Sequence, residues 1–204
     1  PSSEVRRLME TTEGYDEAVW KQMAQELGLQ SLHLPEAHGG QGFTFVELGI
    51  VLEEMGRSLL CAPFFSSVVL AAHALVRSGD EAAMAQWLPG IADGSVIGTL
   101  AHLEDSGRGD ESAVTASAVP SGDGWAVTGT KSYVIDGHVA DLVLVVARTP
   151  AGVSLFAVRG DAPGLVRTRL QTLDLTRAQA RLELEEVPAT LIGTEGHGWA
   201  LLEE

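Results

Sequence analysis

The stretch "GWAVTGTKSYVIDGHVADLVLVVAR", residues 124–148, decides the fold class of this 204-residue chain. Polar and apolar residues alternate in its first part, which is typical of a strand with one buried face. Residues 141–148 form a continuous apolar run that predicts a second strand. Gly and Asp residues between the two parts mark a turn. The stretch therefore predicts two successive strands.

The alternating pattern continues on the C-terminal side. "GVSLFAVR" (152–159) and "ARLELEEV" (180–187) also read as strands, and turns rich in Gly, Asp and Pro separate them. The strands recur about every ten residues with no helical segment between them, which favours a sandwich or barrel over βαβ units. We expect an antiparallel β-sandwich or barrel domain over residues 95–190.

Upstream of Gly94 the periodicity is helical. Thr44 and Glu47 form a capping box that starts one helix, expected to stop at Gly56. Three other helices are expected. They cover residues 16–27, with Gly28 after the end, residues 64–76, and residues 81–88, with Asp80 as the cap and Pro89 as the terminator. The prediction is an α+β chain with a helical domain at 1–94, a β domain at 95–190, and the start of a further helical region at 191–204.

Composition excludes several classes of partner. The formal charge of −15 argues against nucleic acid and against an anionic membrane surface. No apolar run reaches the roughly 18 residues of a membrane span, and the start has no signal-peptide pattern. Cys61, the only cysteine, lies in the apolar "LLCAPFF" and is expected to be buried, and the histidine spacing predicts no metal site. We expect a cytoplasmic protein without membrane insertion.

Several separated motifs in a fixed order resemble the acyl-CoA dehydrogenase family. "LHLPEAHGGQGFTFVELGIVLEEMGRS" (32–58) is similar to its N-terminal signature, and residues 124–149 resemble its strand pair G-x-K-x-W-I-T-N-G-x-x-A-D. "LELEEVPATLIGTEGHGWALL" (182–202) resembles its passage into C-terminal helices. The resemblance implies FAD against the β domain, an acyl-CoA substrate, hydride transfer to flavin N5, an electron-transfer acceptor, and a homo- or hetero-tetramer.

The same resemblance implies that the catalytic base comes from a C-terminal helical bundle. We therefore expect the chain to be truncated before that bundle, and no catalytic residue is named in it. "AHLEDSGRGD" (101–110) occupies the place of the flavin loop A-x-T-E-P-x-x-G-S-D, with Leu103 at its usual Thr. On the facing strand, Tyr133 and Ile135 stand where the family has Trp and Thr. The implied cofactor contacts are Leu100, His102, Leu103, Tyr133 and Ile135, and the implied substrate contacts are Arg108 and Gly109.

The loss of two hydroxyl donors leaves a second interpretation open. "TLDLTRAQARLEL" (172–184) resembles a branch found in actinobacterial and related catabolic clusters. Its members often form one subunit of a heteromeric dehydrogenase, typically in steroid side-chain or dicarboxylic acyl-CoA oxidation. The alternative is thus a non-catalytic or half-site subunit with degenerate flavin contacts. Another flavin reaction, such as nitroalkane oxidation, also stays open. Arg177 and Arg181 are interpreted as phosphate contacts, as strand-edge charges or as contacts to a partner subunit. Lys131 is interpreted as a β-turn lysine, although the resemblance implies a lysine kept there for local structure.

Overall fold

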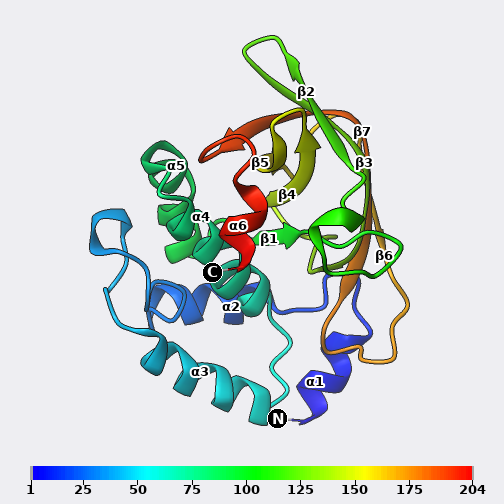
Figure 1. The fold of residues 1–204 in the computed structure, drawn as a ribbon. Coiled ribbons are helices and arrows are strands. Elements are labelled where there is room, and N and C mark those ends of the chain that lie inside the picture. Colours follow the sequence, from blue (N-terminus) through cyan, green and yellow to red (C-terminus); the bar gives the residue numbers. More distant parts are fainter. Residues whose placement is uncertain (1, 204) are drawn as a thin grey trace.

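The computed structural model describes residues 2–203, and helices fill the first half of this range (Figure 1). They are α1 (Ser2–Met9), α2 (Glu17–Gln25), α3 (Phe45–Arg57), the π-helix η2 (Phe65–Ala71), α4 (Ala72–Ser78) and α5 (Glu81–Ala92), with a 3-10 turn η1 (Glu36–His38). The 3-10 turn η3 (Glu111–Ala113) lies in a later loop, and α6 (Gly198–Glu203) follows the last strand. The helix α1 has no counterpart in the sequence prediction.

Local capping signals place the helix starts correctly. The capping box is confirmed: the Thr44 N–H donates to Glu47 Oε2 at 2.8 Å, and the Thr44 hydroxyl accepts from the Val46 N–H. Asp16 caps α2 and Asp80 caps α5 through their carboxylates, which accept backbone N–H groups. Helix starts follow from the sequence because each cap acts within one turn.

Helix ends and continuity differ from the prediction. The helix α5 runs through Pro89 to Ala92, although a proline removes one intrahelical hydrogen bond. Leu88 and Ile91 on either side of it are fully buried, so packing outweighs the lost bond. The single helix expected at 64–76 is a π-helical turn followed by α4.

The second half forms one seven-stranded sheet within residues 2–203. Its strands are β1 (Gly98–Ala101), β2 (Ser117–Ser121), β3 (Gly124–Ile135), β4 (Leu142–Thr149), β5 (Gly152–Arg159), β6 (Leu165–Arg169) and β7 (Gln179–Ile192). The order β4-β2-β3-β7-β5 closes on itself because β5 also pairs with β4. The predicted β-barrel is confirmed. Its hairpins are antiparallel, whereas β4 pairs in parallel with β1 and, at one residue pair, with β2.

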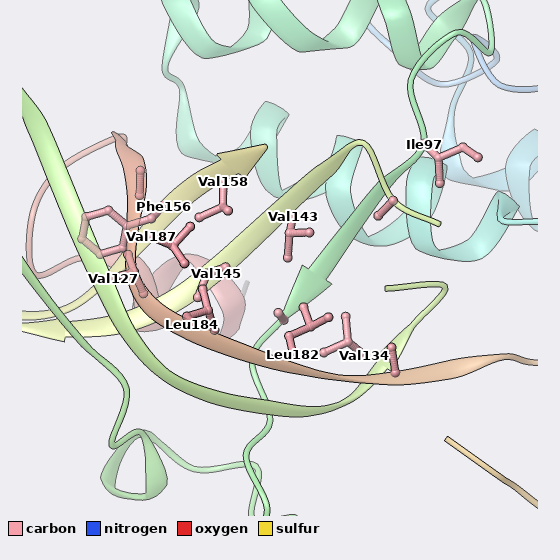
Figure 2. Close-up of a cluster of buried hydrophobic side chains, with 14 of the residues drawn as sticks. Ile97, Val127, Val134, Val143, Val145, Phe156, Val158, Leu182, Leu184 and Val187 are labelled. Carbon is pink, nitrogen blue, oxygen red and sulfur yellow. The ribbon is translucent and has the colours of Figure 1, made fainter. Parts of the chain in front are cut away.

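Strand β4 explains why its sequence is apolar without alternation. Val143 and Val145 point into the barrel interior, where they join Val127, Leu182 and Leu184 (Figure 2). Leu142, Leu144 and Val146 lie on the opposite face, in a second core cluster with α4 and α5. Both faces of β4 are therefore buried, one by the barrel and one by helices. The predicted division near residue 94 lies in the turn between α5 and β1, and the second cluster spans it.

Two further features follow from burial. Cys61 is 3% exposed, which confirms its predicted burial. Trp199, Leu201 and Leu202 of α6 pack against the second core cluster, so this short helix rests on β5 and α4. Among the described residues, no helix is long and apolar enough to cross a membrane.

Candidate flavin site

A buried carboxylate anchors the loop that follows β1. Glu104 accepts hydrogen bonds from Lys131 Nζ at 2.8 Å, from the N–H groups of Thr115 and Ala116, and from the Thr115 hydroxyl. Burial alone raises the pKa of Glu104, but these bonds outweigh burial and hold its pKa below the ordinary value. The loop is thus fixed to β3 by an ion pair and to the segment before β2 by two backbone donors and one hydroxyl.

Lys131 is not a turn residue, so that interpretation is wrong. It lies in the middle of β3, its side chain is fully buried, and its partner is Glu104. Burial lowers the pKa of Lys131, and the contact with Glu104 opposes that shift. A buried lysine needs such a partner, because an unpaired charge in the interior is strongly unfavourable.

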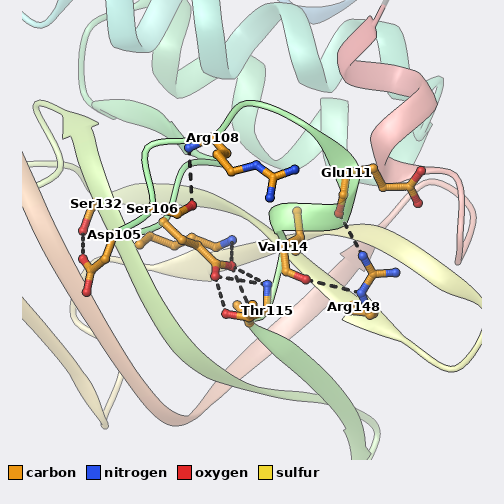
Figure 3. A network of polar contacts seen from close by, with 11 residues as sticks. Asp105, Ser106, Arg108, Glu111, Val114, Thr115, Ser132 and Arg148 are labelled. Carbon is orange, nitrogen blue, oxygen red and sulfur yellow. Dashed lines mark hydrogen bonds and ion pairs between the residues drawn. The ribbon is translucent and has the colours of Figure 1, made fainter.

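A second anchor holds the outer part of the loop. Asp105 accepts from the Ser132 hydroxyl and from Arg181 Nη2 at 3.1 Å, and Figure 3 shows this carboxylate beside Ser132. Arg181 also pairs with Glu183, while Arg177 Nη1 donates to the Leu60 carbonyl at 2.8 Å. Of the two arginines interpreted as phosphate or strand-edge groups, Arg181 therefore braces the loop and Arg177 ties the 172–177 segment to the end of α3.

The backbone of β3 turns Tyr133 outward. The pairing of β3 with β7 shifts between Lys131 and Val134, and Tyr133 has a left-handed φ of +59°. Its side chain is 45% exposed, while the preceding Ser132 N–H donates to the Leu103 carbonyl at 2.9 Å. A left-handed aromatic residue costs about 1 kcal/mol or more, and such strain concentrates at functional positions. The bulge presents the ring of Tyr133 directly beside the flavin loop.

Two open cavities border this region. One of about 530 Å³ is lined by Phe65, Ile135, Leu173, Arg177 and neighbouring polar residues. Another of about 590 Å³ is lined by the loop itself, from Glu104 to Arg108, together with Thr115 and Thr130. Ile135 thus faces the first cavity, and residues of the 101–110 loop face the second, whereas Leu103 and Tyr133 line neither cavity.

The predicted site residues divide into two groups. His102, Leu103, Arg108 and Gly109 lie on the loop, with Leu103 Cδ2 3.9 Å from the position that a Cβ on Gly109 would occupy. Arg108 is exposed and pairs with Asp110 through a 2.9 Å contact. Leu100, by contrast, is 8% exposed and belongs to the core shared with the helices.

The loop fits a flat, acceptor-rich ring such as that of FAD. The N–H groups of Leu103, Asp105 and Ser106 donate no hydrogen bond to another residue in 2–203. His102 Nδ1 is buried and has no partner among the same residues, and burial, assisted by Lys131, lowers the pKa of this imidazole. The three N–H groups are thus unpaired donors on a loop whose Leu103 carbonyl bonds to Ser132, the residue before Tyr133.

No described carboxylate at these cavities has the character of a strong base. Asp174 lines the 530 Å³ cavity, but hydrogen bonds from the Thr176 side chain and backbone lower its pKa. Glu104 is committed to Lys131. Asp174 is therefore not a candidate for the catalytic base. The expectation that the catalytic base comes from a C-terminal helical bundle stays a prediction.

Some groups near the site were not found from the sequence, and others lie elsewhere. Ser66 and Asp136 form a hydrogen bond at the edge of the site. The sequence predicted only the turn that contains Asp136, and not its contact with Ser66. His33 lies in a turn with both ring nitrogens buried and without a hydrogen-bond partner among the described residues, and its ring contacts Phe45. Burial lowers the pKa of His33 to about 4, so its ring is neutral.

Comparison with known proteins agrees with this architecture of a helical region followed by a mixed β-barrel. The family model "Acyl-CoA dehydrogenase, N-terminal domain" matches residues 3–95, and "Acyl-CoA dehydrogenase, middle domain" matches residues 100–187. The chain belongs to the acyl-CoA dehydrogenase family. Members of this family bind FAD.

Individual relatives and solved structures are similar to most of this chain. It is 35% identical over 170 residues to acyl-CoA dehydrogenase FadE27 of Mycobacterium tuberculosis, covering 83% of this chain and 44% of the relative. Among solved structures, the Tcur3481-Tcur3483 steroid ACAD variant has 32% identity and a TM-score of 0.85, covering 100% of this chain and 55% of that one. The ChsE4-ChsE5 complex from Mycobacterium tuberculosis has 31% identity and a TM-score of 0.86, with 98% and 54% covered. The chain spans about half the length of the curated relatives it matches.

Proposed function

We propose that this chain provides the flavin-binding part of an FAD-dependent acyl-CoA dehydrogenase, which oxidises the Cα–Cβ bond of an acyl-CoA thioester. The observation that carries this proposal is the outward-turned Tyr133 beside unpaired N–H groups of the 103–106 loop, in a chain of this family. FAD, when bound, would accept the hydride from the β-carbon. The α-proton would pass to a base that is not identified among the described residues, and an electron-transfer acceptor would take the two electrons.

In this proposal the chain's residues bind and orient. Tyr133 and Ile135 contact the flavin ring, and His102 together with the backbone of Leu103 provides polar groups at its edge. Arg108 and Gly109 lie farther along the loop and are proposed to contact the acyl-CoA. The Glu104–Lys131 pair keeps the loop in place without itself reaching the ligand.

A specific observation favours the alternative function. Leu103 and Ile135 offer no side-chain donor where the family places two hydroxyls, and each lost hydrogen bond weakens binding by on the order of 1 kcal/mol. Two such losses correspond to roughly a 30-fold weaker affinity for FAD. The similar solved structures named above include a two-protein complex and a steroid ACAD. A half-site subunit of a cytoplasmic hetero-tetramer, acting on a steroid or fatty acyl-CoA, is therefore the second candidate.

Visible absorbance of the purified protein separates the candidates. Stoichiometric FAD on the protein alone supports the first, whereas FAD that appears only after co-expression with a homologous partner supports the half-site subunit. A colourless preparation in both cases refutes flavin binding. Turnover of an acyl-CoA panel with an artificial electron acceptor then distinguishes dehydrogenation from other flavin chemistry, such as nitroalkane oxidation.

A further inference from the structure

The wall of the 530 Å³ cavity is formed by two elements that meet at one hydrogen bond. Phe65 at the start of the π-helix and Ile135 at the end of β3 both line the cavity. The residue after each of them, Ser66 and Asp136, are joined by a contact of 2.7 Å between Ser66 Oγ and Asp136 Oδ2. This contact links the helical region to the β-barrel across seventy positions of sequence.

The contacts of Ser66 with Asp136 and with the Pro63 carbonyl indicate which protonation state of Asp136 satisfies both. Ser66 Oγ lies 2.7 Å from Asp136 Oδ2 and 3.1 Å from the Pro63 carbonyl oxygen. A hydroxyl has a single hydrogen to donate, and a carbonyl oxygen only accepts. Both contacts are hydrogen bonds at the same time only if Ser66 donates to Pro63 and a protonated Asp136 donates to Ser66. An ionised Asp136 takes the Ser66 hydrogen and leaves the Pro63 carbonyl without it.

The surroundings of Asp136 also favour its neutral form. Burial raises the pKa of Asp136 to about 6, against opposing effects of the Ser66 hydrogen bond, Arg177 and Arg169. Tyr15, ahead of α2, and Cys61, after α3, are the other titratable groups that interact with it. The pair thus changes protonation at mildly acidic pH.

The backbone around Asp136 is held independently of this proton. Asp136 has a left-handed φ of +53°, and its N–H donates to the Ala178 carbonyl at 2.9 Å. One residue earlier, the Ile135 carbonyl accepts from the Thr99 hydroxyl at 2.6 Å. Asn is well suited to a left-handed position, and Asn stands here in the family pattern quoted above. The carboxyl group is therefore a departure that adds an ionisable group without altering the turn.

We propose that Asp136 is a protonatable positioning residue, which with Ser66 clamps the end of β3 to the start of the π-helix and sets the separation of Phe65 and Ile135. The clamp is closed when Asp136 carries its proton and Ser66 bridges to Pro63. When Asp136 is ionised, Ser66 donates to the carboxylate instead of to Pro63. The link to β3 then remains, while the Pro63 carbonyl keeps only its hydrogen bond from the Ser67 N–H. Only the claim that this cavity belongs to the flavin site rests on the proposed function.

A carboxyl NMR titration tests the clamp without any ligand. Asp136→Asn identifies the Asp136 resonance, and we expect its midpoint near pH 6, accompanied by shifts of the Ser66 and Ser67 amides. In Ser66→Ala the hydroxyl that links Asp136 to Pro63 is gone, so the amides of residues 66 and 67 should no longer shift through the Asp136 midpoint. Asp161→Asn, at an exposed aspartate that pairs with Arg159, should leave the midpoint and these amide shifts in place. A midpoint near that of an ordinary aspartate, or amide shifts that persist unchanged in Ser66→Ala, overturns the proposal.

FAD titration from about pH 5 to about pH 8 tests the positioning role. In Asp136→Asn the amide hydrogens can donate to Ser66 as the protonated acid does, so this variant represents a closed clamp at every pH. We expect the FAD affinity or flavin spectrum of the unmodified protein to change through the Asp136 midpoint, and that of Asp136→Asn to stay flat. Equal pH curves for the two proteins refute the positioning role. If no FAD binds, the proposed function fails, while the NMR titration still decides whether the clamp exists.

Discussion

The stability of Asp136→Asn as a function of pH is the sharpest prediction from this structure. Burial raises the pKa of Asp136 from 3.8 to about 6, so the folded state holds its proton at pH values where the unfolded state has released it. Stability from this group is fully present below about pH 4 and is lost as the pH rises through about 6. Neutral Asn does not ionise, so the variant escapes that loss.

The magnitude follows from the size of the shift. A difference of about two pKa units corresponds to about 3 kcal/mol at neutral pH, and partial solvent contact of Asp136 lowers this to roughly 1–3 kcal/mol. Asp136→Asn should therefore be more stable than the unmodified protein by that amount at about pH 7.5. For a chain of this size, this corresponds to a Tm increase of roughly 2–10 °C.

Urea denaturation at several pH values between about 4 and 8 measures the difference. The two proteins should converge near pH 4 and separate as the pH rises, with most of the separation between about pH 4.5 and 6.5. Asp161→Asn serves as a matched control, because this exposed aspartate lies on the barrel surface and its pKa is lowered by Arg159. A constant difference across the range, or an Asn variant that is less stable at neutral pH, would show that burial does not govern Asp136.

Three further predictions concern the flavin loop and its supports. Lys131→Ala should destabilise the protein by about 3–5 kcal/mol, because it leaves the Glu104 carboxylate buried without its cation. Urea denaturation measures this loss. Partial recovery of stability in the double variant with Glu104→Gln is the expected sign that the two residues are coupled. Ile135→Thr should strengthen FAD binding about five-fold by restoring one hydroxyl donor, with Ile135→Val as the control without a hydroxyl; a fluorescence titration in which the two variants bind equally would contradict a flavin contact at this position. Tyr133→Gly should stabilise the ligand-free protein by about 1 kcal/mol, since glycine adopts a φ of +59° without strain. The same variant should bind FAD more weakly. A variant that lowers stability and leaves the FAD affinity unchanged argues for simple packing of the tyrosine.

Short-range signals account for the parts of the fold that the sequence predicted well. The Thr44–Glu47 capping box, the Asp80 cap and the apolar run of β4 each act within a few residues, so their pattern alone fixes local geometry. The barrel followed from strands at regular spacing without intervening helices. The ordered motifs likewise indicated the family that the comparisons show.

The errors occur where distant residues decide a local outcome. Pro89 predicts the end of a helix, yet burial of Leu88 and Ile91 carries α5 on to Ala92. Lys131, within a predicted strand, is interpreted from the sequence as a β-turn lysine, but the fold brings Glu104 to it and encloses both. Propensity is a weak influence compared with the burial of large side chains, so tertiary packing prevails in such places.

The sequence by itself determined the helix starts, the strand order along the chain, the acidic surface charge and the altered hydroxyl positions at Leu103 and Ile135. Only the tertiary structure decided which strands meet to close the barrel, how Tyr133 turns outward, and that Ser66 and Asp136 share a hydrogen. Capping and periodicity arise from neighbours along the backbone, which a sequence displays directly. Desolvation of a carboxyl group and the pairing of a buried lysine depend on residues dozens of positions away, and folding alone brings these within contact distance.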